Sequence, residues 1–287
     1  MSEQMSIYAF KLNVAHNSQP LQQILNTILN TPLDHRTRDV GAKVRVEDIS
    51  FDANRNVWLM DFGKFRSNHG PGKASTRTPV VGFNFQQGEK FLEETACLYD
   101  QTNGYFIVQF NQSGVRHGKI AGYLSTFSQS QTNFYELLPV VDQNAQATLR
   151  NRTGIKRFVL KIAPRNFTEA DRRSGASLKK ALAMANTSGS ENILIQMSSG
   201  LKKASRLSGF VDTLLNEAHQ LFIRNPDAVE KLEASVVTTS DTVEVIDMIS
   251  HRLKDVVPIN PGADLRFPRQ QRYNALLRAY SSWNPSY

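Results

Sequence analysis

The sequence has a single cysteine, no long hydrophobic run and none of the residue spacings that commonly hold a metal. Cys97 excludes an internal disulfide and agrees with a reducing compartment. No run of about 18 apolar residues is present to span a bilayer, and the start MSEQMSIYAF lacks the basic and apolar regions of a signal peptide. We therefore expect a cytoplasmic protein without membrane insertion.

Catalytic signatures are also scarce. The six histidines show no H-x-x-x-H, H-E-x-x-H or H-x-H spacing, and no acid stands two residues before a lysine as in D…E-x-K nucleases. We expect no metal, no cofactor and no enzymatic activity. The alternative is a metal-dependent nuclease, in which carboxylates of the strand regions gather around Mg²⁺: Glu47, Asp48, Asp52 and Asp61.

A basic loop, KFRSNHGPGKASTRTPVVGF, contains no acid, three glycines and two prolines. It differs from a phosphate-binding Walker loop because Ser67 replaces the first glycine and Ala74 follows the lysine. Two interpretations remain, a solvated loop between strands and a basic flap that contacts a polyanion. The flap would use four cations: Lys64, Arg66, Lys73 and Arg77.

The formal net charge of +8 is unevenly distributed along the 287 residues. Residues 1–149 hold 13 Lys/Arg and 13 Asp/Glu, residues 150–206 hold 13 against 3, and residues 207–287 hold 8 against 10. A basic segment of this kind repels itself unless a polyanion or an acidic surface neutralises it. The charge therefore points to a negatively charged partner.

Within the middle segment, the cations fall on one side of each expected element. In the strand at 155–163, alternation turns Phe158 and Leu160 inward and places Arg157 and Lys161 on the opposite face, about 13 Å apart. The helical periodicity that follows has a basic arc opposite an apolar one. The expected nucleic-acid contacts of this segment are Arg157, Lys161, Arg165, Arg172, Arg173, Lys179, Lys180, Lys202, Lys203 and Arg206.

Competing explanations come from the acids of residues 210–255, where nine acids stand against four bases. These acids could pair internally with the basic helices, or the basic face could meet an acidic protein partner. We expect nucleic acid, with DNA ahead of RNA. Because no helix-turn-helix, zinc spacing or RNP motif is present, we expect binding that does not depend on base sequence.

The order of the elements predicts an α+β protein with two domains. Strand patterns dominate the first half, including residues 5–14, a hairpin around Asn103 and Gly104, and residues 155–164, and amphipathic helices follow. We expect a mixed, mainly antiparallel sheet with short helices over residues 1–165 and a mainly helical domain over residues 166–287.

The last predicted helix carries an apolar stripe formed by Tyr273, Leu276, Leu277 and Tyr280, with Trp283 beyond. This stripe must be buried. It either docks on its own domain or forms the contact of a homodimer, which would double the basic surface.

The segments TACLYDQTNGYFIVQF, HGKIAGYLSTF, FYELLPVV and RFVLKIAPRNF resemble, in their order, the middle of the lambda-type RexA phage-exclusion proteins. They are also similar to uncharacterised proteins that accompany phage-defence genes, including the second component of Kiwa systems. The resemblance covers roughly residues 93–185 and rests on element order, without a diagnostic motif.

The resemblance implies a dimeric, sequence-nonspecific DNA-binding protein of phage exclusion, acting with a companion defence protein and without enzymatic activity of its own. No active-site residue is carried over, because that family has no fixed catalytic motif.

Overall fold

The structure is a computed structural model that describes residues 3–16, 18–66, 70–128, 135–168, 171, 179, 190–200 and 205–283. The chain divides into two compact units. Unit 1 combines Met1–Leu137 with Lys254–Tyr287, and unit 2 is the intervening Leu138–Leu253. The boundary that we predicted near residue 165 therefore falls inside unit 2, and the last 34 residues return to the first unit.

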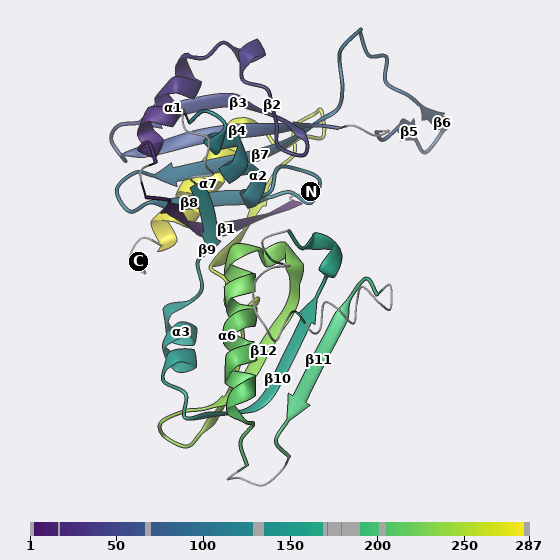
Figure 1. Cartoon of the computed structure of the whole chain (residues 1–287). Helices are drawn as coiled ribbons and strands as arrows, with labels where there is room; N and C mark the ends of the chain where they lie inside the picture. Colours follow the sequence, from purple (N-terminus) through teal and green to yellow (C-terminus); the bar gives the residue numbers. More distant parts are fainter. Residues whose placement is uncertain are drawn as a thin grey trace. The chain divides into compact units, whose positions relative to one another are not determined.

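Unit 1 is built on a curled antiparallel sheet, a half-barrel, with the strand order β14-β1-β8-β7-β4-β3-β2 (Figure 1). An eighth strand, β9, pairs with β1, and β5 with β6 forms a separate two-stranded ribbon. The strands are β1 (Glu3–Val14), β2 (Arg38–Asp39), β3 (Lys43–Asp52), β4 (Val57–Phe65), β5 (Lys73–Ser75), β6 (Thr78–Val81), β7 (Leu92–Asp100), β8 (Tyr105–Phe110), β9 (Tyr135–Pro139) and β14 (Lys254–Ile259).

Helices cover the two faces of this sheet. Helices α1 (Leu21–Asn30) and α2 (His117–Ser125) contribute side chains to a core that includes Phe62 and Tyr123. The terminal helix α7 (Arg269–Trp283) contacts β7, β8 and β14, and buries Tyr273, Leu276, Tyr280 and Trp283. The stripe predicted from the sequence is thus docked on its own unit.

The predicted hairpin is confirmed, and its turn shows why the sequence signal was strong. Gly104 has a φ of +68°, a left-handed conformation that glycine adopts without steric cost. The Asp100 carboxylate accepts hydrogen bonds from the backbone N–H groups of Thr102 and Asn103, at 2.8 and 3.2 Å. The turn therefore fixes the register of β7 against β8.

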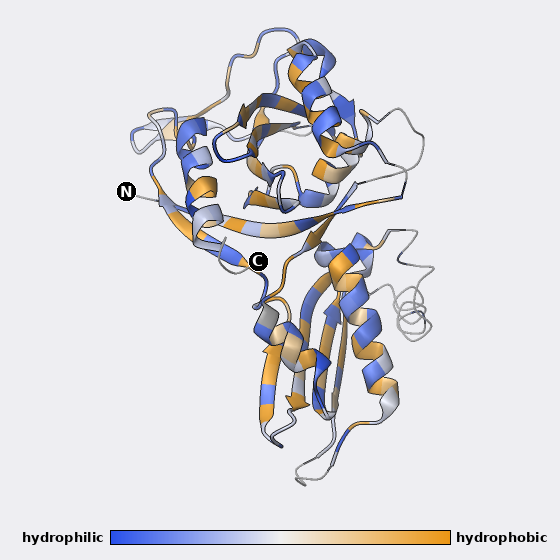
Figure 2. Cartoon of the chain, turned by 90° about the vertical axis from the view of Figure 1, so that its left-hand side faces the viewer, coloured by the Kyte–Doolittle hydropathy of each residue, from blue (hydrophilic) through white to orange (hydrophobic). Residues whose placement is uncertain are grey.

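Unit 2 is a second antiparallel sheet, in the order β11-β10-β12-β13, packed against a long helix. Its elements are α3 (Gln143–Arg150), β10 (Gly154–Ile162), η2 (Pro164–Asn166), β11 (Ile193–Ser198), α6 (Gly209–Arg224), η3 (Pro226–Ala228), β12 (Val229–Val237) and β13 (Val243–Asp247). In Figure 2 both the strands and the helix of this unit carry hydrophilic and hydrophobic residues, as expected for elements that bury one face.

The α+β class is confirmed, but the prediction of a mainly helical C-terminal domain is wrong. Among the described residues beyond 165 there are four strands, β11 to β14, beside the helices α6 and α7. Strands β11 and β12 pair with β10, β13 pairs with β12, and β14 pairs with β1 from the start of the chain. Short strands of this kind depend on distant partners, so local periodicity favoured the longer helices. No helix among the described residues is long and apolar enough to cross a bilayer.

Candidate nucleic-acid interface

The predicted cations of β10 lie on one face of the strand, as expected, but each one has an acidic neighbour. Arg157 Nη1 lies 3.1 Å from Glu233 Oε1, and Lys161 Nζ lies 2.6 Å from Glu230 Oε2. Both acids come from β12, the strand beside β10. Phe158 is fully buried on the opposite face. The charge of this sheet face is therefore largely balanced within unit 2.

Two further predicted cations also form ion pairs. Arg165 Nη1 lies 3.2 Å from Glu191 Oε2, and Arg206 Nη2 lies 3.2 Å from Asp241 Oδ1. These pairs are partly exposed, so each stabilises the fold by at most about 1 kcal/mol and can exchange partners. Lys179 is exposed. The remaining predicted contacts lie outside the described residues: Arg172, Arg173, Lys180, Lys202 and Lys203.

The basic loop forms a projecting arm, which we define as residues 66–91. Its base is closed where the backbone N–H of Arg66 donates to the carbonyl of Phe91 at 2.9 Å. Its tip is the ribbon of β5 and β6, which Figure 1 shows away from the main sheet. All residues from 71 to 90 are exposed. The segment between β4 and β7 thus contains a short hairpin, which is compatible with both a solvated loop and a basic flap.

The arm combines cations with exposed apolar side chains. Phe83, Phe85 and Phe91 form a small aromatic cluster with ring centroids 4.7 to 6.3 Å apart. Lys73 Nζ lies 5.9 Å from the centroid of the Phe83 ring. Within the described residues, no carboxylate forms an ion pair with the three cations of the arm beyond its base: Lys73, Arg77 and Lys90.

Further cations gather where the arm joins the sheet, at a site that we call the arm root: Lys64, Arg66, Arg116 and Lys119. Burial lowers the pKa of the Lys64 ammonium below its usual value, Glu93 opposes this shift, and the positive charges of Lys119, Arg116 and Arg66 add to it. Three positive charges and one negative charge thus surround Lys64, so the arm root carries more positive than negative charge.

Only one of these root cations forms an ion pair within the described part of the chain. Arg66 Nε lies 2.8 Å from Glu93 Oε1. Arg116 stacks over the Phe110 ring at 4.3 Å, and Lys119 Nζ donates to the carbonyl of Val40 at 3.0 Å. Sequence analysis missed Arg116 and Lys119, because nothing in their local pattern places them beside a strand that ends about fifty residues earlier.

The carboxylates proposed for a nuclease each have another role. Asp61 is buried against Arg272 and Arg269, and Asp48 accepts a hydrogen bond from the Tyr273 hydroxyl at 2.9 Å. Glu47 pairs with Arg45, and Asp52 with Arg55. Across the described ranges, no group of three His, Cys, Asp or Glu side chains is arranged to hold a metal ion.

The sequence profile of one protein family, described as a family of unknown function (DUF6731), matches residues 12–282. No curated protein matches the chain. The match spans most of both units and carries no assigned activity.

Proposed function

The chain belongs to the DUF6731 family, whose function is unknown. From the geometry of the chain, we propose that it binds nucleic acid through the phosphate backbone. DNA is the expected polymer, ahead of RNA. The contact is made by the arm and the arm root, whose cations are Lys64, Arg66, Lys73, Arg77, Lys90, Arg116 and Lys119.

One contrast supports this assignment. Four described cations on or near β10 form ion pairs with carboxylates, whereas those of the arm and root, apart from Arg66, form no ion pair within the described residues. Cations without a protein counterion keep their attraction for phosphates and release condensed counterions when they bind. The arm is therefore the better candidate for the first contact than the strand face.

The shape of the arm agrees with this role. A two-stranded ribbon is of a size that the major groove of B-DNA admits. The cations at the arm root would then meet the flanking phosphates. Since phosphate contacts carry no base information, the binding is expected to be largely independent of sequence.

Two finer parts of the proposal rest on the sequence. The cations of residues 150–206, including those outside the described residues, would form a second contact, and a homodimer would present two arms to one duplex. A role in phage exclusion, together with a companion defence protein, follows from the resemblance to RexA-like proteins. A plaque assay on cells that express the wild-type protein or an arm variant tests that role.

The binding experiment compares two variants with equal losses of charge. Fluorescence anisotropy with a short labelled duplex is measured at several salt concentrations for wild type, for Lys73→Ala/Arg77→Ala/Lys90→Ala and for Arg157→Ala/Lys161→Ala/Arg165→Ala. A plot of log affinity against log salt has a negative slope. We expect this slope to be less steep for the arm variant by roughly 3, one unit for each lost phosphate contact. The strand variant should keep most of the wild-type slope.

Two results would reject the proposal. One is equal binding by wild type and the arm variant, and the other is an absence of binding by wild type in dilute buffer. Incubating the same duplex with protein and Mg²⁺ or Mn²⁺ separates binding from the nuclease alternative, since a binder leaves the strands intact.

A further inference from the structure

The sheet of unit 1 contains a slot beside the end of β8. This strand is short: its pairing with β7 stops at Val108 and Cys97, and its pairing with β1 stops at Phe110 and Ser6. Both neighbours continue past these points. Residues 92–96 of β7 pair with β4 on one side, and residues 3–5 of β1 pair with β14. On the sides that face each other, no strand among the described residues pairs with these stretches.

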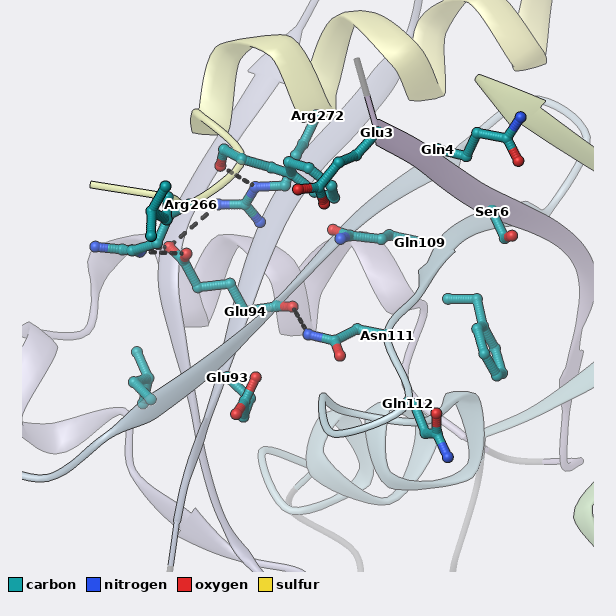
Figure 3. Close-up of a pocket in the computed structure, with 14 residues that line it drawn as sticks. Glu3, Gln4, Ser6, Glu93, Glu94, Gln109, Asn111, Gln112, Arg266 and Arg272 are labelled. Atoms are coloured by element: carbon teal, nitrogen blue, oxygen red, sulfur yellow. Dashed lines mark hydrogen bonds and ion pairs between the residues drawn. The ribbon is translucent and has the colours of Figure 1, made fainter. Parts of the chain in front are cut away.

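A cavity of about 580 Å³ occupies this slot. Figure 3 shows residues of β1 on one side, Glu93 and Glu94 of β7 on the other, and Gln109 between them. Where β8 pairs with both neighbours, β1 and β7 are two strand spacings apart, roughly 10 Å. The slot therefore begins with the width of one extended chain.

At the inner end of the slot, side chains make some of the hydrogen bonds to β7 that a neighbouring strand would otherwise make. The backbone N–H of Ala96 donates to Gln109 Oε1 at 3.0 Å, and Asn111 Nδ2 donates to the carbonyl of Glu94 at 2.9 Å. Gln109 is only 6% exposed. Its amide Nε2 donates to no partner among the described residues and is open to solvent in the slot. A ligand carbonyl in the slot would accept that hydrogen bond.

The rim of the slot has an unusual residue. Leu265 is 87% exposed and has a φ of +62°, in the left-handed region that non-glycine residues rarely adopt. Such a conformation stores roughly 1 kcal/mol or more of strain, and strained residues cluster at binding sites. Leu265 thus presents an apolar side chain beside the polar cavity.

We propose that this slot binds an extended peptide segment of a partner protein, which adds a strand between β1 and β7. The lining favours a peptide over a small organic ligand. Small-molecule pockets are mostly apolar, whereas charged, amide and hydroxyl side chains make up most of this lining, beside Leu92, Phe110, Leu265 and Phe267, and open strand edges flank it. Main-chain hydrogen bonds to those edges supply the affinity.

The charges of the slot define the peptide further. Arg266 and Arg272 both pair with Glu94, and Glu93 pairs with Arg66. Glu3 forms no ion pair with any residue that the structure describes, so it is available to the ligand. The bound segment therefore carries a Lys or Arg side chain that meets Glu3. This site adjoins the arm root, because Glu93 pairs with Arg66, but the proposal does not depend on the nucleic-acid contact.

A display library of linear peptides tests the proposal on the intact protein. Selected peptides are labelled, and their affinities are measured by fluorescence anisotropy for wild type, Gln4→Trp and Glu3→Arg. We expect enriched peptides to contain a Lys or Arg, and both variants to weaken binding at least about tenfold. Asp34→Arg is the charge-matched control, since Asp34 is exposed and does not line the slot; it should bind like wild type.

The chemistry of the peptide backbone distinguishes an added strand from side-chain docking. N-methylation of alternate amides removes the donors to one strand edge, and the two methylated series remove the donors to β1 and to β7 respectively, so both series should lose binding. Failure to enrich any peptide, or affinities that Gln4→Trp and methylation leave unchanged, would overturn the proposal. Glu3 and Gln4 are exposed, and thermal melts verify that the variants remain folded.

Discussion

Arg272 of α7 donates hydrogen bonds from both terminal guanidinium nitrogens, Nη1 and Nη2, to the carboxylate of Asp61 of β4, at 2.5 and 2.8 Å. The side chains are 2% and 0% exposed. Arg269 adds a third contact to the same carboxylate at 3.0 Å, and Arg272 Nη2 also reaches Glu94 at 3.1 Å. A buried ion pair thus fixes the C-terminal helix to a central strand from the first half of the chain.

Breaking this pair should cost more than replacing it. Asp61→Asn leaves the buried Arg272 cation without its full counterion, so we expect the free energy of unfolding to fall by about 3–5 kcal/mol. The double change Asp61→Leu/Arg272→Leu removes both charges and should cost clearly less than the single one. Urea unfolding measures both. The exposed Asp264→Asn is the control, expected within about 0.5 kcal/mol of wild type.

The acid limit of stability should depend on His219 of α6. Burial lowers the pKa of its imidazole, and the nearby positive charge of Arg152 adds to the shift. Below about pH 6.5 the imidazole takes up a proton in the unfolded state but stays neutral in the folded state until a lower pH. The contribution of His219 to the free energy of unfolding is therefore fully present above about pH 6.5 and is lost as the pH falls. Melting temperatures of wild type should therefore fall between pH 7 and pH 5 more steeply than those of His219→Gln.

A matched control uses a histidine in a different setting. His35 is 74% exposed, and His35→Gln should leave the steepness of the pH dependence unchanged. Equal slopes for wild type and His219→Gln would contradict the role assigned to burial.

Removing the acids beside β10 should expose its cations. In Glu230→Gln/Glu233→Gln, Lys161 and Arg157 lose their carboxylates with little change of shape. If nucleic acid reaches this face, its binding should strengthen and the salt slope should steepen by about 1 to 2. Anisotropy titrations with duplex DNA measure this. An unchanged slope would restrict the contact to the arm.

Local sequence patterns predicted those helices, strands and turns whose conformation is specified by neighbouring residues in the sequence. The strand at residues 5–14, the turn at Gly104 and the terminal helix all carry a signal within a few neighbouring side chains. The strand β14 has no such signal. Its six residues gain their conformation from the edge of β1, where Val257 lies opposite Met5.

The candidate site shows the same division. The sequence reveals how many cations a segment holds, but not which carboxylates face them after folding. Glu233 and Arg157 are 76 residues apart and meet only because β12 lies beside β10. In the same way, the excess charge at the arm root depends on α2 lying close to the end of β4, which no periodicity predicts.

The pairing of β1 with β14 has a consequence for how the molecule is made. Glu3 lies opposite Ile259, so a ribosome delivers all of unit 2 before the opening strand receives that neighbour. A chain halted just before residue 254 would keep an unfinished sheet with a bare edge that invites misassembly. Unit 1 can therefore complete its sheet only after β14 has been synthesised.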